Sequence, residues 1–115
     1  MKQIVSIALL LLSGAAYALS LDGSWELRYW PTPISGGVRC VDDVPATAAR
    51  IPAVVPGNVE LDMVRAGLLP NLFFSTNALS VRDYEAHQWM LSRTFVYNRS
   101  LEDGERLCLN FGGVD

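Results

Sequence analysis

The sequence predicts a mostly β fold, an incomplete jelly-roll type of β-sandwich with one short helix at about residues 59–66. Two segments predict strands: residues 24–29 alternate hydrophobic and charged residues, and residues 88–97 carry apolar side chains on both faces. A helix flanked by a Pro-Gly turn and a glycine separates them. About four or five strands are expected, which is few for a closed two-layer sandwich. We therefore expect a truncated sandwich.

The first two strands differ in their patterns. Residues 24–29 read SWELRY, in which Trp25, Leu27 and Tyr29 alternate with charged residues. Residues 30–49 contain Pro and Gly without periodicity and predict a long surface loop. Residues 51–55 form a short apolar run that Pro52 interrupts. Because proline cannot donate to a strand ladder, this run is expected at an edge or a strand end.

The second half of the chain contains the most hydrophobic strand. Residues 88–97 carry apolar side chains on both faces, which predicts an interior strand of a sandwich. Before it, residues 71–87 form an aromatic-rich loop. After it, Asp103-Gly104 predicts a turn, and Leu107, Leu109 and Phe111 alternate in a last predicted strand.

The helix has start and stop signals. Asn58 is a favourable N-cap, and Gly67 suits the C′ position. Leu61, Val64 and Leu68 are spaced i, i+3, i+7 and predict the stripe that packs on the sheet. A helix of about two turns is unstable alone, so packing of this stripe is required.

Residues 1–18 are predicted to be a secretory signal peptide. A lysine precedes an apolar run, and Ala16-Tyr17-Ala18 has the small-x-small form of a cleavage site. The expected mature domain is 19–115, exported to the periplasm or outside the cell. No stretch is long enough for a membrane span, so no membrane is expected as a partner. The formal net charge of −3 argues against nucleic acid, whose binders carry a concentrated basic face.

The chain has two cysteines, Cys40 and Cys108. In an exported protein this pair permits a disulfide. A small buried thiol at Cys108 is the alternative. One histidine, His87, and two distant cysteines give no cluster with metal-ligand spacing, so neither a metal nor a cofactor is expected.

Several motifs together resemble a known family. Residues 21–25 (LDGSW) look like an opening LxGxW strand, and residues 111–115 (FGGVD) resemble an FxGVD element. Between them, a Pro-Gly turn, the helix and a WxxxxxF strand from Trp89 to Phe95 occur in the same order. This arrangement resembles the galactose-binding-like, N-terminal sugar-binding domain of glycoside hydrolase family 2, especially its β-mannosidase-like branch.

The resemblance implies a non-catalytic domain of a retaining glycosidase. Such enzymes use two carboxylic acids about 5 Å apart, which in this family lie on a later barrel domain. No catalytic residue is therefore assigned here, and the chain alone is expected to be inactive. Its expected partners are a carbohydrate substrate and the C-terminal domains of the same polypeptide. Its expected role is to brace the barrel and to lend the loop 77–89 to the substrate pocket.

Four residues are the candidates for contact with sugar: Asn77, Tyr84, Gln88 and Trp89. Asn77 falls where the family commonly carries an Asn, and aromatic rings can pack on sugar rings. Core packing is the alternative for Trp89. Gln88 stands where mannosidase-like members often carry an acid, which loosens the relation to mannose. The alternatives to an enzyme domain are a free-standing secreted carbohydrate-binding module and an inactive gene fragment.

Overall fold

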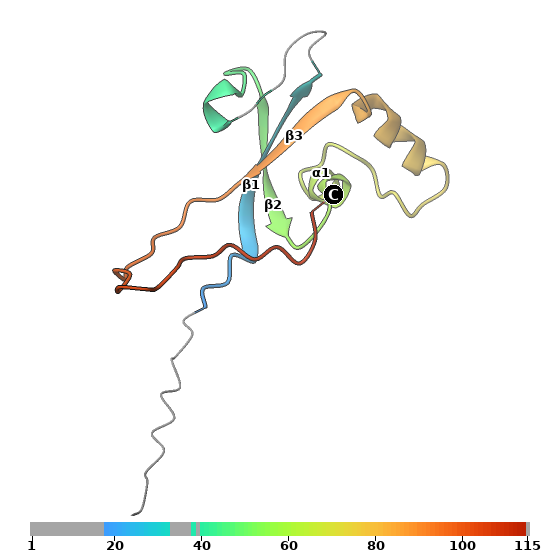
Figure 1. Ribbon diagram of the computed structural model, residues 1–115. Coiled ribbons are helices and arrows are strands. Elements are labelled where there is room, and N and C mark those ends of the chain that lie inside the picture. The colour runs from blue at the N-terminus through green and yellow to red at the C-terminus, as the bar shows by residue number, and fades with distance from the viewer. Residues whose placement is uncertain (1–17, 33–37, 39, 115) are drawn as a thin grey trace, which may run out of the picture.

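Three antiparallel strands, one α-helix and two 3-10 helices make up the part of the chain that the computed structural model describes, residues 18–32, 38 and 40–114 (Figure 1). In chain order these are β1 (Gly23–Pro31), η1 (Val41–Asp43), β2 (Ala49–Val55), α1 (Val59–Arg65), η2 (Asn77–Tyr84) and β3 (His87–Ser92). The predicted signal peptide lies almost wholly outside the described residues. Within them, no helix is long and apolar enough to cross a membrane.

The strands form one sheet in the order β2-β1-β3. Both pairings of β1 are antiparallel, and Leu27 lies opposite Ile51 on one side and Leu91 on the other. The prediction for residues 51–55 is confirmed, because β2 is an edge strand and tolerates Pro52 there. The mostly β fold is likewise confirmed, as the antiparallel sheet of a partial sandwich.

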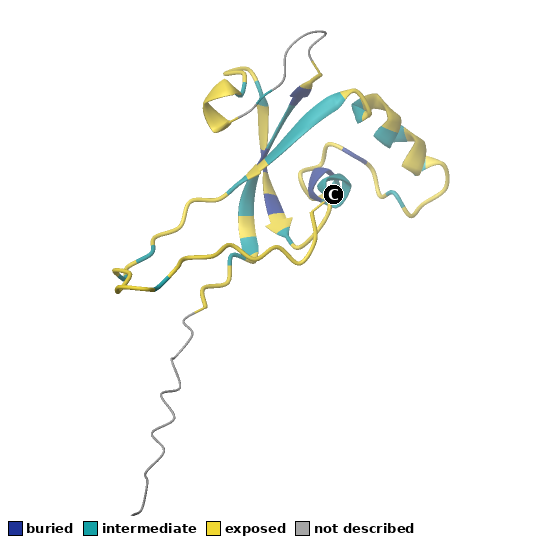
Figure 2. Cartoon of the chain, viewed as in Figure 1, coloured by how far each residue is buried: buried dark blue, intermediate teal, exposed yellow. Residues whose placement is uncertain are grey.

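One face of the sheet carries the core. Leu27, Ile51 and Ala53 of the sheet pack against Met63 and Leu69, and all five are buried. Figure 1 shows α1 and η2 together on the right-hand side of the sheet. Figure 2 shows that the buried residues gather where the strands meet α1. The helices thus stand where the second layer of a sandwich would otherwise cover this face.

The predicted limits of the helix are confirmed. The Asn58 side chain accepts a hydrogen bond from the backbone N–H of Leu61 at 2.9 Å, as an N-cap does. Gly67 has a φ of +76°, and the N–H of Leu68 returns to the carbonyl of Met63 at 2.9 Å. This is the Schellman ending of a helix, which requires the left-handed conformation that glycine adopts most easily.

The predicted packing stripe of α1 is partly wrong. The buried helix residues are Asp62 and Met63, whereas Leu68 is 43 % exposed. Asp62 turns inward because its Oδ1 accepts from the backbone N–H of Val54 at 3.2 Å and from Arg65 at 2.6 Å. The buried carboxylate thus joins α1 to the neighbouring edge strand. Met63 is the buried apolar residue of α1, and Val59 and Val64 pack against the same core cluster while partly exposed.

The last part of the chain differs from its predicted strands. The predicted strand 88–97 ends at Ser92 and lies at an edge of the sheet, not in its interior. Residues 107–111 are extended but belong to no strand of the described chain. Figure 2 shows this segment exposed along most of its length. Alternation marks the faces of a strand, but a strand also needs a ladder partner, and the described residues offer none here.

Two arginines make side-chain contacts in the segment after β3. Arg93 donates to the backbone carbonyls of Leu21 and Asp22 at 2.7 and 2.6 Å, which ties the exit of β3 to the start of β1. Further on, Arg99 pairs with Glu105 across the turn. The predicted turn at Asp103-Gly104 is present, with Gly104 at a φ of +82°.

Both cysteines are free. Cys40 and Cys108 are exposed, and no disulfide joins them. The alternative of a buried thiol at Cys108 is also wrong, because the strand that would have buried it does not form.

Candidate functional site

Four rings from three elements form a cluster at one end of the sheet. Tyr29 of β1 stacks on Trp89 of β3 with a centroid distance of 5.2 Å and an interplanar angle of 29°. Tyr84, the last residue of η2, meets Tyr29 edge to face at 6.0 Å. His87 lies 5.3 Å from Tyr84. Trp89 and Tyr29 meet because the register of the sheet places them opposite each other.

The electrostatics of this cluster follow from its burial. Removal of Tyr29 from water raises the pKa of its hydroxyl, and the neighbouring Tyr84 raises that pKa further. The Nδ1 atom of His87 is buried and has no hydrogen-bond partner among the described residues. The cluster is therefore an apolar aromatic surface with few internal polar contacts.

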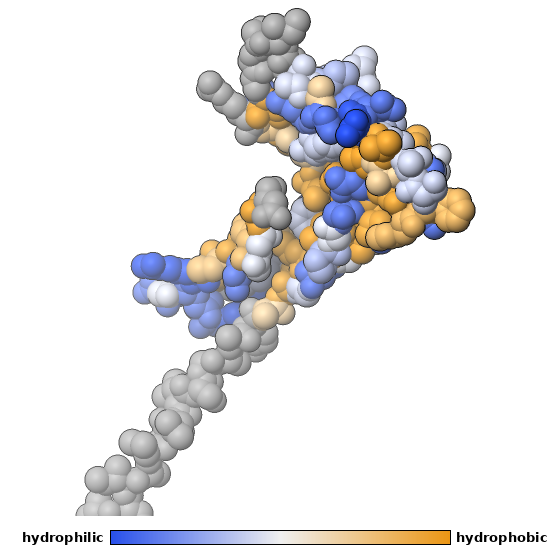
Figure 3. All heavy atoms as spheres, turned by 90° about the vertical axis from the view of Figure 1, so that its right-hand side faces the viewer, coloured by the Kyte–Doolittle hydropathy of each residue, from blue (hydrophilic) through white to orange (hydrophobic). Residues whose placement is uncertain are grey.

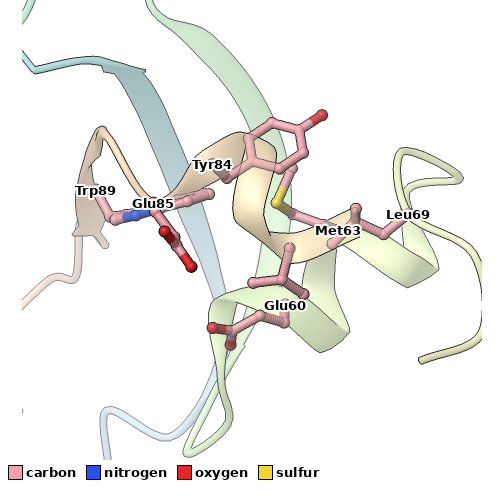
Figure 4. Close-up of a pocket in the computed structure, with 7 residues that line it drawn as sticks. Glu60, Met63, Leu69, Tyr84, Glu85 and Trp89 are labelled. Atoms are coloured by element: carbon pink, nitrogen blue, oxygen red, sulfur yellow. The ribbon is translucent and has the colours of Figure 1, made fainter. Parts of the chain in front are cut away.

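A cavity of about 150 Å³ lies beside the cluster, between α1, η2 and β3. Its lining residues are Glu60, Met63, Leu69, Val81, Tyr84, Glu85 and Trp89. Figure 4 shows the side chains of η2 and β3 facing those of α1 and the residues that follow it. The local sequence explains this arrangement, because Gly67 ends α1 and lets the chain turn back so that Leu69 joins the floor.

Two of the four predicted sugar contacts meet in this cavity. Tyr84 and Trp89 both line it and also pack against the core cluster. The core-packing alternative for Trp89 is therefore present in the structure, and its contact with sugar stays a prediction.

Gln88 does not reach the cavity. In β3 it alternates with Trp89 and so lies on the opposite face of the sheet. Its Oε1 accepts a hydrogen bond from the Nε1–H of Trp30 at 3.0 Å. Trp30 is only 5 % exposed and lies directly opposite Gln88 in the strand register. The Gln88 side chain therefore provides the hydrogen-bond acceptor for the buried indole N–H of Trp30.

Asn77 also lies apart from the cavity lining. It opens η2, and its Nδ2 donates to the backbone carbonyl of Asn71 at 3.0 Å. Its own carbonyl accepts from the hydroxyl of Ser80 at 2.6 Å. Asn77 thus shapes the loop that leads into η2.

The aromatic residues of that loop are strongly exposed. Phe73 and Phe74 are 87 % and 71 % exposed, and Leu79 is 52 % exposed. Figure 3, viewed from the side of α1 and η2, shows hydrophobic side chains gathered over this side of the molecule. Adjacent exposed apolar groups of this kind are typical of a contact surface.

A second, more open hollow is lined by residues of β1 and β2. It has a volume of about 330 Å³ and is lined by Trp25, Glu26, Arg50, Ile51 and Pro52. Its one acid is engaged, because Arg28 donates to Glu26 at 2.6 Å and lowers the pKa of that carboxyl. The described residues contain no group of three or more potential ligands that would hold a metal ion.

Sequence reasoning missed several residues of the first cavity. The acids Glu60 and Glu85 line the cavity, although neither belongs to a sequence motif that predicts a site. Met63 was not singled out. The one signal that could have identified Glu85 is its position directly after Tyr84, which was a predicted site residue. The approach of α1 to η2 depends on a reversal of the chain between them, which no local sequence pattern predicts.

The region from η1 through β3 carries the family relationship. Residues 39–115 match the family described as the glycosyl hydrolase 2 galactose-binding domain-like family. A search of curated proteins and a search of solved structures each gave no match. The match spans more than half of the chain and includes every element that lines the cavity. It confirms the predicted resemblance to the N-terminal domain of these hydrolases. The chain therefore belongs to the galactose-binding-like domain family of glycoside hydrolase family 2.

Proposed function

We propose that this chain is the non-catalytic N-terminal domain of an exported glycoside hydrolase, and that it supports a separate catalytic barrel. The observation that carries the proposal is the match of residues 39–115 to the family. The exposed apolar residues Phe73, Phe74 and Leu79 support the bracing role, because a surface of this kind gains free energy when a second domain covers it.

The segment 77–89, which includes η2 and the start of β3, is proposed to contribute to the substrate pocket. Tyr84 and Trp89 present ring surface in a cavity, which suits the apolar C–H face of a sugar. The order of the sequence motifs favours the β-mannosidase-like branch over the β-galactosidase-like one. Gln88 is not proposed as a sugar contact, because its carboxamide oxygen is bonded to Trp30.

Export is proposed from the first eighteen residues, whose apolar run and Ala16-Tyr17-Ala18 site have the form of a signal peptide. The expected result is secretion with an N-terminus at Leu19. Mass spectrometry of the secreted protein measures this directly, and an intact Met1 on the exported protein would contradict the proposed cleavage.

The principal experiment compares the chain with the product of its complete reading frame. The 115-residue chain should not hydrolyse aryl β-mannosides or β-galactosides. The DNA after the Asp115 codon should continue in frame into a barrel, and the complete product should be active. Substantial turnover by the chain alone, or a stop codon directly after Asp115, would refute the proposed role.

Within the complete enzyme, Tyr84→Ala should raise KM more than it lowers kcat, since a ring that only contacts sugar contributes mainly to binding. Tyr84→Phe retains the ring and is the matched control. An unchanged KM in Tyr84→Ala would remove η2 from the substrate pocket.

The second candidate is a free-standing secreted carbohydrate-binding module. The observation in its favour is that Tyr84 and Trp89 present aromatic rings in a cavity formed between α1, η2 and β3. It predicts that the 115-residue product unfolds cooperatively and binds glycans without a partner domain.

A further inference from the structure

The cavity beside the aromatic cluster is lined by apolar and aromatic side chains and by two acids. Its floor is formed by Met63 and Leu69, which are 1 % and 6 % exposed, and Tyr84 and Trp89 add two aromatic rings. The only ionisable acids in its lining are Glu60 and Glu85. Figure 4 shows these two carboxylates on the same side of the cavity as Trp89. The site is therefore apolar and aromatic with an acidic rim.

Among the residues that the structure describes, neither rim acid has an ion-pair partner. The ion pairs found among the described residues join Glu26, Asp62 and Glu105 to arginines and involve neither Glu60 nor Glu85. No lysine or arginine lines the cavity. Two carboxylates that share a site without a counter-charge favour a ligand that brings positive charge.

The polar groups of the cavity favour a cationic ligand over a neutral one. An ionised carboxylate only accepts hydrogen bonds, and an ammonium group only donates them. A neutral sugar hydroxyl has a single hydrogen-bond donor, whereas an ammonium group has three, so the ammonium group can donate to both carboxylates at once. The ring faces of Tyr84 and Trp89 add attraction for a cation, because the face of an aromatic ring carries partial negative charge.

The volume of the cavity suits one face of a sugar ring, because a hexosamine has many more non-hydrogen atoms than benzene. Its volume is about 150 Å³, and an engineered cavity of about 150 Å³ in another protein accepts benzene. The family relationship makes a carbohydrate ring the relevant six-membered ring. This step rests on the family and does not require a catalytic barrel.

We propose that this cavity binds a single protonated amino sugar, a 2-amino-2-deoxyhexose unit. Its C–H face packs on Trp89 and Tyr84, and its ammonium group lies at the carboxylates of Glu60 and Glu85. The site would give the domain a preference for deacetylated, positively charged glycans over neutral ones.

The test is a set of ligand titrations of the purified protein at pH 6, where glutamate is ionised and an amine is protonated. The indole N–H signals in a proton–nitrogen NMR spectrum report binding at Trp89. D-glucosamine should bind roughly tenfold more tightly than D-glucose or N-acetyl-D-glucosamine, which corresponds to about 1.4 kcal/mol. Equal affinities for the three sugars, or no binding of glucosamine, would overturn the proposal.

A fourth ligand separates the amino sugar from a general cation. If n-butylamine binds as tightly as D-glucosamine, the cavity accepts any alkylammonium group and the carbohydrate part of the proposal is wrong. A weaker affinity for n-butylamine supports packing of the sugar ring on the aromatic floor.

Variants locate the charge effect. Glu60→Gln and Glu85→Gln should each reduce the preference for glucosamine about threefold, and the double variant should abolish it while glucose affinity stays unchanged. Asp83→Asn is the matched control, because Asp83 is an exposed acid of η2 that does not line the cavity. A full preference in the double variant, or an equal loss in Asp83→Asn, would show that the cavity does not recognise the ammonium group. Circular dichroism confirms that each variant is folded.

Discussion

Replacement of Asp62 by alanine tests whether a buried carboxylate holds α1 to the sheet. Asp62 is 2 % exposed, and its Oδ1 accepts from the N–H of Val54 at 3.2 Å and from Arg65 at 2.6 Å. A hydrogen bond to a charged group is worth about 1.5 to 3 kcal/mol. The arginine side chain is 56 % exposed, so its pair adds about 1 kcal/mol or less. Asp62→Ala should therefore lower the free energy of unfolding by about 2 to 4 kcal/mol.

Urea unfolding followed by tryptophan fluorescence and circular dichroism measures this loss. Asp62→Asn is the matched control, because it keeps an acceptor for Val54 while it removes the charge, and it should cost about half as much. Arg65→Ala should cost about 1 kcal/mol or less. A loss below about 0.5 kcal/mol in Asp62→Ala would refute the view that this carboxylate connects helix and strand.

Three further outcomes are expected. Gly57→Ala should destabilise the protein by about 1 to 3 kcal/mol, because the added methyl would lie 2.4 Å from a backbone oxygen. Gly112→Ala should be neutral, because no atom lies within 4 Å of the added methyl there. Similar melting temperatures for the two variants would contradict this prediction. Gln88→Leu should cost about 1 to 3 kcal/mol in urea unfolding, because it leaves the buried N–H of Trp30 unpaired, and wild-type stability would show that water replaces the amide. In an absorbance titration, Tyr29 should ionise above its ordinary pKa of 10.0. Because the pKa is raised in the folded state, the stability that Tyr29 contributes is complete below pH 10 and is lost as the pH rises through the folded pKa. Ionisation of all tyrosines at the ordinary pKa would contradict the burial of this ring.

Features that depend on neighbouring residues could be predicted from the sequence. The N-cap at Asn58, the C′ glycine at Gly67 and the turn glycine at Gly104 each act within a few residues, and all three occur in the structure. The alternation of residues 24–29 likewise predicts the central strand, because the period of a strand is local.

Features that depend on the strand register could not be predicted. The contact between Trp30 and Gln88 joins residues 58 positions apart. The cavity depends on α1 and η2 meeting over one face of the sheet, which no local pattern encodes. Residues 107–111 show the converse, because a correct alternation does not produce a strand where the described chain provides no partner.

The bond from Asp62 to Val54 also determines where the sheet can grow. Because backbone groups of a strand alternate in direction, the outward N–H positions of β2 are Val54, residue 52 and Arg50. Val54 is already bonded to Asp62, and residue 52 is a proline without an N–H. Only Arg50 remains as a donor, so β2 is a poor template for another strand. Any additional strand, from this polypeptide or another, should therefore pair with β3 and not with β2. The sheet of the sandwich can then be extended from only one of its two edges.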